Sequence, residues 1–354
     1  MLVVLIMFWR KQKTLLNNNS VNTMYNKLLI VIFGFIILFT ACVDSTKDLN
    51  IDVSDTPLPK VKIKRYEQAM FRIPADSFIA IAPSKQKEFP VFLQGDINDT
   101  AALIELKSFF CDPYMKELYR LTMEQFPSLD GLEEDLSKAM QHYYHYFPAA
   151  TYLNYYSYIS GLDVKYPVKF IGNNIIIGLD NYLPNSRIYI KSGFPKYQSK
   201  WYIPERIIPD CMTEIASGLM PKQEKGESLL DQMIYQGKLL YFAKAMQPNI
   251  ADSLLLKYSA KQYAWCKHYE DKVWAVMVDN QFLFKKEQNL IRKFMEDGPF
   301  TAVFSKESPS RTGWFIGFRI VSAYMARNDV SMAELLMEKD SQKILKKSKY
   351  KPSN

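Results

Sequence analysis

Few side chains in this sequence have the types and spacings that catalysis or metal binding requires. The chain contains three histidines, His142, His145 and His268, and none stands in the H-E-x-x-H arrangement of zinc peptidases. His142 and His145 are three residues apart and could face the same way on a helix, as metal ligands must. No carboxylate stands at matching spacing beside them, so packing or surface placement of this aromatic-rich helix is favoured over metal binding. Walker and G-x-S-x-G motifs do not occur in the sequence.

A polar residue interrupts the apolar stripe of the segment LLDQMIYQGKLLYFAKAM, residues 229–246. Spacings of four and three place five residues on one face of an amphipathic helix: Leu229, Met233, Gln236, Leu240 and Ala243. Gly237 follows the glutamine, and glycine inside a helix costs about 1 kcal/mol relative to alanine. Helix propensity alone would not select the pair Gln236-Gly237, so we expect it to serve a particular contact.

Arg311 is a second candidate, in the segment SPSRTGWFIGF. It lies in a loop of small residues just ahead of an expected helix, with Thr312 placed as its cap. The guanidinium could hold the carboxylate of a ligand, although a structural ion pair within the fold is the favoured use. Gly313 and Gly317 would let another backbone approach this helix closely.

The elements around these residues are mostly helical. Apolar residues fall at helical spacing from Asp99 to His145, with breaks at Asp112-Pro113 and Phe126-Pro127. The middle segment YPVKFIGNNIIIGLDNYL carries β-branched runs with a turn at Gly172. Helices return from about Ile203 onward. The sequence therefore predicts a helix-rich α+β fold, with a small central sheet packed on helices.

The N-terminal region has the features of a bacterial lipoprotein signal. The run MYNKLLIVIFGFIILFTAC places one lysine, an apolar core and small residues before Cys42, which would receive acyl chains. A transmembrane anchor is the alternative, but the apolar run is shorter than the roughly 20 residues of a comfortable span. Residues 1–41 are thus expected to be a signal peptide whose true start is Met24. Lipid at Cys42 would anchor the protein to the periplasm-facing surface of an envelope membrane, inner or outer.

The mature chain is expected to have three parts: a flexible tether over residues 42–59, a globular domain over 60–340, and a basic flexible tail over 341–354. Without residues 1–41 the charge balance is 41 basic against 37 acidic residues, so the net charge falls from +8 to +4. That excess is too small to argue for a nucleic-acid partner. Three cysteines remain, Cys111, Cys211 and Cys266, which do not form a disulfide framework, although one bridge could form in the periplasm.

The order of several segments resembles the GldB-type gliding-motility lipoproteins of the Bacteroidetes. The resemblance runs from about Lys60 to Met337 and is carried by these segments: the loose lipobox at Cys42, VKIKRYEQAMF, NNIIIGLDNYL, YIPERIIPDCMTEIA, LLDQMIYQGKLLYFAKAM and SPSRTGWFIGFRIVSAYM. It implies an envelope lipoprotein that is required for surface gliding in species that glide. The family also occurs where gliding is absent, so the resemblance does not imply that the source organism moves.

That family is in turn similar to predicted zinc peptidases, which implies a zincin-like scaffold. Those proteins carry H-E-x-x-H on one helix and a glutamate just before a glycine on a later helix. Here the first helix would be IIPDCMTEIA, without histidine, and Gln236 stands where the later glutamate would be. An amide cannot replace a carboxylate at a hard cation, so no metal or cofactor is expected. Asp210 and Glu214 are the acidic residues that the alignment brings to the former site.

Two functions of different class follow. In the first, the protein is a non-catalytic envelope factor that binds a peptide or partner protein in a degenerate peptidase-like cleft, with Gln236, Gly237, Asp210, Glu214 and Arg311 as candidate residues. In the alternative, it is a metal-independent hydrolase that acts on an envelope substrate through Asp210 and Glu214. Two acids on one helix are commonly plain surface or capping residues, so the non-catalytic function is favoured.

Overall fold

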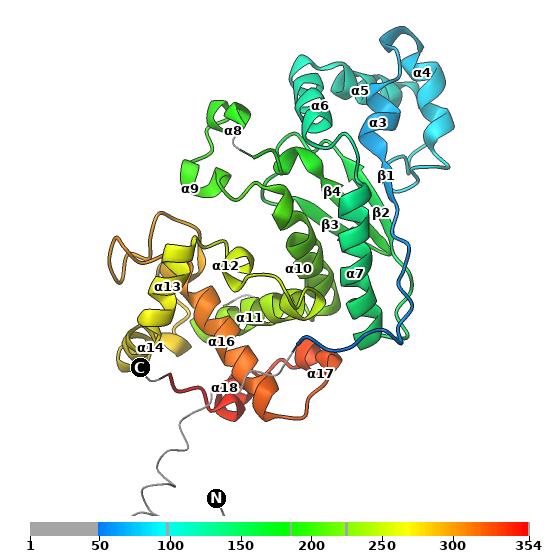
Figure 1. The fold of residues 1–354 in the computed structure, drawn as a ribbon. Helices are drawn as coiled ribbons and strands as arrows, with labels where there is room; N and C mark the ends of the chain where they lie inside the picture. Colours follow the sequence, from blue (N-terminus) through cyan, green and yellow to red (C-terminus); the bar gives the residue numbers. More distant parts are fainter. Residues whose placement is uncertain (1–48, 97–98, 185, 224–225, 353–354) are drawn as a thin grey trace, which may run out of the picture. The chain divides into compact units, whose positions relative to one another are not determined.

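The computed structural model describes residues 49–96, 99–184, 186–223 and 226–352, which all belong to one compact unit that begins at Thr46. The expected signal peptide and Cys42 lie outside the described residues. Figure 1 shows a body made mostly of helices with a small sheet among them. Within the described ranges, no helix combines the length and the apolar character that crossing a membrane requires. The helix-rich α+β fold predicted from the sequence is confirmed.

The sheet has four strands in the order β1 (Ile63–Arg65), β2 (Asn154–Tyr158), β4 (Asn174–Gly178) and β3 (Val168–Ile171). β1, β2 and β4 are mutually parallel, whereas β3 pairs antiparallel with β4 through a tight turn at Gly172. Gly172 has φ +57°, a left-handed conformation that glycine adopts without the cost of a side chain. The turn predicted at this glycine is confirmed.

The two faces of the sheet are buried against different groups of residues. Successive side chains of a strand point to opposite faces, so Tyr155 of β2 enters the main core while Tyr156 enters a smaller aromatic cluster. That cluster is built by the early helices, where Tyr66 stacks on Phe92 with ring centroids 4.0 Å apart. Both faces of the sheet therefore lie in the interior, and β4 reads as a continuous run of buried isoleucines.

The N-terminal helices are α3 (Tyr66–Phe71), α4 (Phe78–Ile81), α5 (Thr100–Cys111), α6 (Pro113–Gln125) and α7 (Asp130–Tyr146). Asp99 caps α5 by accepting hydrogen bonds from two backbone amides, and Asp112 caps α6 in the same way. Pro113 occupies the first position of α6, where a missing N–H costs nothing. The helix breaks predicted at Asp112-Pro113 and Phe126-Pro127 are confirmed.

Three longer helices form the centre of the main core: α10 (Ile207–Leu219), α11 (Leu229–Met246) and α16 (Thr312–Arg327). α11 starts with a reciprocal capping box between Ser228 and Asp231, and it is buried on nearly all sides. It packs between α10 and α16, as Figure 1 shows. The other helices are shorter: α8 (Arg187–Lys191), α9 (Lys196–Ser199), α12 (Asp252–Leu255), α13 (Ala260–His268), α14 (Glu270–Asp279), α15 (Gln288–Met295), α17 (Met332–Met337) and α18 (Ser341–Ser348).

The two segments expected to be flexible are partly held by the body. Within the predicted tether, Val53 and Thr56 form a turn, and their carbonyl oxygens accept hydrogen bonds from Gln141 Nε2 of α7 at 3.2 and 2.7 Å. Within the predicted tail, α18 packs on α16 and buries Ile344 completely. The structure thus differs from both expectations for these residues, because backbone carbonyl groups find a donor on α7 in the first segment and an apolar side chain reaches the core in the second.

Candidate functional site

A pocket of about 260 Å³ opens between α10 and α11. Its lining includes Asp210 and Glu214 from α10 and Gln236 from α11, three of the residues that the sequence analysis selected. Further lining residues come from the loop at 164–168, from the end of α12 and from the start of α16. Gly237 and Arg311, the other two candidates, do not line this pocket.

α10 carries the two acids on one side because they are four residues apart, one helical turn. Its opposite face is apolar, with Cys211, Met212 and Ile215 fully buried against the core. Burial of that face fixes the rotation of the helix about its axis. The acids therefore have to point toward α11 and the pocket.

Asp210 is held by its neighbours. Its side chain is 13% exposed and pairs with the guanidinium of Arg206, one turn earlier, which is 3% exposed. Tyr182 Oη donates a hydrogen bond to Asp210 Oδ2 at 3.1 Å, and Lys257 Nζ lies 4.0 Å from Oδ1. Burial raises the pKa of Asp210, whereas the positive charges of Arg206 and Lys257 lower it. The lowering effects together are larger, so the pKa of Asp210 lies below its ordinary value. Asp210 is thus an ionised carboxylate with partners on both oxygens.

Glu214 has a different environment. Burial raises its pKa, the backbone amide of Phe170 opposes that shift, and the negative charge of Asp210 adds to it. The net effect is a pKa above the ordinary value for glutamate. The pocket therefore contains two carboxyl groups on adjacent turns whose pKa values are pushed apart.

Lys257 is the main cation that sequence reasoning missed. It follows α12 with φ +54°, and burial lowers its pKa to about 8 although the nearby Asp210 opposes the shift. Its position depends on a left-handed backbone that no local motif in the sequence indicates. Arg206 could have been found, because it stands four residues before Asp210 on the expected helix.

Gln236 is half-buried and lines the pocket beside Tyr235. The Tyr235 hydroxyl pairs with Ser217 Oγ at 2.9 Å across the two helices. No hydrogen bond of the Gln236 amide is found among the described residues. Its donor and acceptor groups are therefore available in the pocket.

Gly237 has a structural role instead of the predicted role in a cleft. A β-carbon on Gly237 would lie 2.3 Å from the carbonyl oxygen of Gly317 in α16. A β-carbon on Gly317 would lie 1.9 Å from the carbonyl oxygen of Met233. Two glycines thus let the backbones of α11 and α16 touch, as the sequence predicted for Gly317. The placement of Gly237 in the cleft is wrong, because its open side faces another helix.

Arg311 lies outside the pocket lining and contacts two residues that line the pocket. It is 4% exposed, with Nε 3.6 Å from Asp297 Oδ1 and Nη2 donating to the Lys257 carbonyl oxygen at 3.3 Å. Its guanidinium lies 4.8 Å from the ring centroid of Trp314, which lines the pocket. α16 begins at Thr312, and Arg311 takes the cap position with φ +57°. This is the structural use that the sequence favoured, here directed at two lining residues.

The part of the chain that the structure describes contains no group of three or more His, Cys, Asp or Glu side chains that could hold a metal ion. The histidine pair of α7 is separated from the acids of this pocket. His142 lines another groove, between α7 and the end of α11, and His145 Nδ1 lies 3.2 Å from Thr56 Oγ1. The three cysteines Cys111, Cys211 and Cys266 are free thiols.

Comparison with known proteins gives one match. A family model described as gliding motility protein GldB matches residues 46–352, a span that includes the whole pocket and both helices around it. No curated protein and no solved structure matches the chain.

Proposed function

The chain belongs to the gliding motility protein GldB family, and from that premise we propose that it is a non-catalytic envelope lipoprotein whose α10–α11 pocket binds a peptide segment of a partner protein. Membership in this family implies a gliding-motility lipoprotein of the cell envelope. The proposal also includes acylation of Cys42 and a body that faces the periplasm. In this proposal the α10–α11 pocket recognises the partner protein.

The observation that carries the proposal is the Gln236 amide. It lines the pocket, and no hydrogen bond engages it within the described residues. An amide offers one acceptor and two donors, which match the N–H and C=O groups of a peptide backbone. Tyr235, Tyr166 and Trp314 give the same pocket aromatic surface, which buries apolar side chains at low entropic cost.

The charges of the pocket support binding more than catalysis. A general base needs a free carboxylate, but both oxygens of Asp210 already have partners in Tyr182 and Arg206. In this proposal the pocket is a peptidase-like cleft without metal, which has kept the ability to hold a chain.

Site-specific cross-linking in the native envelope would test the proposal. A photo-reactive amino acid in place of Gln236 is expected to give a covalent adduct with a partner protein in cells that produce the full-length lipoprotein. The matched control is Gln342, an exposed glutamine of α18 outside the pocket. Equal adducts at both positions, or none at Gln236, would reject the pocket as the binding site.

The alternative function, a metal-independent hydrolase, keeps one observation in its favour. The pKa of Glu214 is raised while that of Asp210 is lowered, the division of roles that acid and base pairs show. Incubation of the purified protein with isolated cell-envelope material decides between the two. Hydrolysis that is lost in Glu214→Gln would support the enzyme, and unchanged material would support the binding protein.

A further inference from the structure

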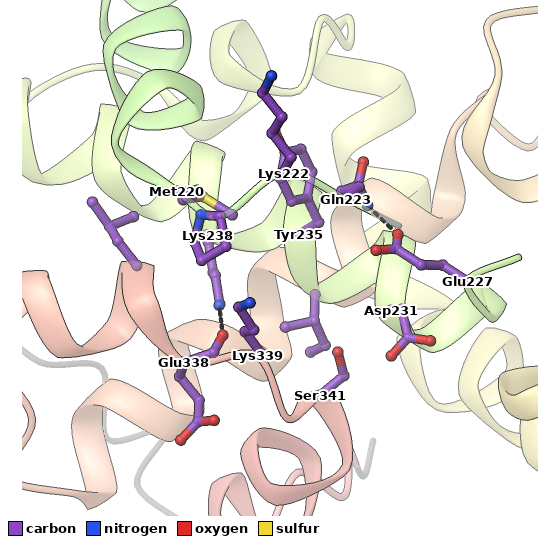
Figure 2. A pocket seen from close by; sticks show the side chains of 13 residues that line it. Met220, Lys222, Gln223, Glu227, Asp231, Tyr235, Lys238, Glu338, Lys339 and Ser341 are labelled. Atoms are coloured by element: carbon purple, nitrogen blue, oxygen red, sulfur yellow. Dashed lines mark hydrogen bonds between the residues drawn. The ribbon is translucent and has the colours of Figure 1, made fainter. Parts of the chain in front are cut away.

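A second pocket, of about 290 Å³, opens on another face of α11 (Figure 2). It lies between that helix, the loop that follows α10 and the turn between α17 and α18. Tyr235 lines both pockets, and its hydroxyl pairs with Ser217 Oγ, which lines the first pocket. The residues around the second pocket include three lysines, Lys222, Lys238 and Lys339.

Lys238 is a buried cation whose hydrogen-bond acceptor is neutral. It is 4% exposed, and its Nζ donates to the backbone carbonyl oxygen of Glu338, just after α17. That bond uses one of the three ammonium protons. The Glu338 carboxylate is occupied elsewhere, by Lys343 Nζ and by the Asp340 amide. Burial lowers the pKa of Lys238 to about 8, although the negative charge of Glu338 partly opposes the shift.

The acids at the rim are also engaged by other groups. Asp231 accepts hydrogen bonds from the backbone amide and hydroxyl of Ser228 at 2.9 and 2.7 Å, and these bonds cap α11. Gln223 Nε2 donates to Glu227 at 2.5 Å. Within the described residues Asp231 forms no ion pair with Lys238. The positive charge of this buried lysine is therefore not compensated by the carboxylate nearest to it along α11.

We propose that this second pocket binds an oxyanion, a carboxylate or phosphate group, with Lys238 as its buried cation. In Figure 2 Lys339 lies on the same side of the pocket as the Lys238 ammonium, whereas Lys222 extends away from it. Lys339 is the second cation of the site, and Ser341 adds a hydroxyl donor at the start of α18. The bound anion adds negative charge beside the buried ammonium group of Lys238, where attraction is stronger than between two fully exposed charges.

A purely structural role for Lys238 makes a different prediction. If the ammonium group only caps the end of α17, removing it would alter stability, and no anion would bind. The site is also independent of the α10–α11 pocket. Failure of either proposal would leave the other standing, because Gln236 takes no part in the second pocket.

Equilibrium dialysis of the full-length protein in an uncharged detergent tests the site. Radiolabelled inorganic phosphate and acetate serve as probes at constant ionic strength, set with chloride. One saturable site per chain is expected for at least one probe. Lys238→Met is expected to weaken binding at least about tenfold, a loss typical of a charge-assisted contact, and Lys339→Met a few-fold. Lys347→Met, which removes an exposed lysine of α18, is the control and should bind as the wild type does.

Several outcomes would overturn the site. No saturable binding of either probe to the wild type rejects it, and so does undiminished binding by Lys238→Met. Should Lys238→Met fail to fold, Lys339→Met decides, because this exposed side chain can be removed without disturbing the core. Unchanged binding there also rejects the site. Short-chain phosphatidic acid in a parallel arm separates the sources: tighter binding than phosphate identifies a lipid headgroup, and equal binding a free anion.

Discussion

Gly237 of α11 and Gly317 of α16 meet backbone to backbone, so closely that a β-carbon on Gly237 would lie 2.3 Å from the Gly317 carbonyl oxygen. The helix that presents Gln236 to one pocket and Lys238 to the other is thus fixed by the residue between them. Packing of α11 on α16 sets the positions of both sites.

Gly237→Ala should strongly destabilise the protein. The new methyl group meets rigid backbone, so the helices have to separate, at a cost of about 2 kcal/mol or more in the free energy of unfolding. Gly131 of α7 is the matched control, because nothing lies within 4 Å of the position that a methyl group would take there. Gly131→Ala should be neutral or stabilising by about 0.5 to 1 kcal/mol. Urea denaturation compares the two, and equal effects would contradict the packing role.

Arg311→Ala should lower the free energy of unfolding by about 2 kcal/mol, because the change leaves Asp297 without its ion pair and removes the support under Trp314. Arg311→Lys should recover only part of this loss, since an ammonium group lacks the planar fork. Lys347→Ala, on the exposed side of α18, is expected to change nothing. Thermal denaturation of the three variants measures this order of stability. An Arg311→Ala variant as stable as the wild type would exclude a structural role for Arg311.

Lys238 makes stability depend on pH. Its pKa is about 8 in the folded protein against an ordinary 10.5, so the unfolded chain binds more protons between these values. The free energy of unfolding therefore carries a penalty below pH 8, which is relieved as the pH rises toward 10.5. Lys238→Met should reduce this rise to the part that Lys257 contributes, since the pKa of Lys257 is also lowered to about 8, while Lys347→Met should keep the whole rise. Urea denaturation between pH 7 and 9.5 tests this, and parallel curves for wild type and Lys238→Met would refute it.

The protein should contain no stoichiometric zinc after extensive dialysis. A catalytic zinc site needs three protein ligands around an open position. The α10–α11 pocket offers Asp210, already paired with Arg206, together with Glu214 and the amide of Gln236. Gln236→Glu should also remain metal-free, and it should lose stability by adding a partly buried charge. Mass spectrometric metal analysis decides, and one tightly held zinc per wild-type chain would end the metal-free proposal.

Cys42→Ala should leave an unprocessed precursor without acyl chains. Stable membrane attachment depends on several chains, since a single one binds only marginally. The mutant should therefore differ from the wild type in mass and in its partition into detergent. A conservative Cys111→Ala change, at a thiol far along the chain in α5, is the control. Identical behaviour of wild type and Cys42→Ala would rule out lipidation at this residue.

Local signals in the sequence predicted much of the fold. Asp112-Pro113 ends one helix and begins the next because proline and a capping acid act within a few residues. The glycines of α16 predicted a close backbone contact, because the missing side chain is also a local feature of the sequence. By contrast, the direction of Gly237 depends on how two distant helices cross, which spacing along one helix does not determine.

The candidate site was predicted in part. Resemblance to a family brought Asp210, Glu214 and Gln236 together, and the structure places all three in one pocket. Lys257 was missed because its position follows from an unusual backbone angle after α12. Lys238 was missed because a lysine in an amphipathic pattern is expected on a solvated face, and only tertiary contacts with α17 bury it.

The burial of α11 also limits how the two pockets can adjust to a ligand. Its backbone amides are hydrogen-bonded within a helix that has core on nearly every side, so they should exchange with deuterium only when the whole domain unfolds. Local fraying of this helix cannot admit or release a ligand. Any adjustment of either pocket to a bound ligand must therefore come from its other walls, which include the loop at 164–168 for one and the α17–α18 turn for the other.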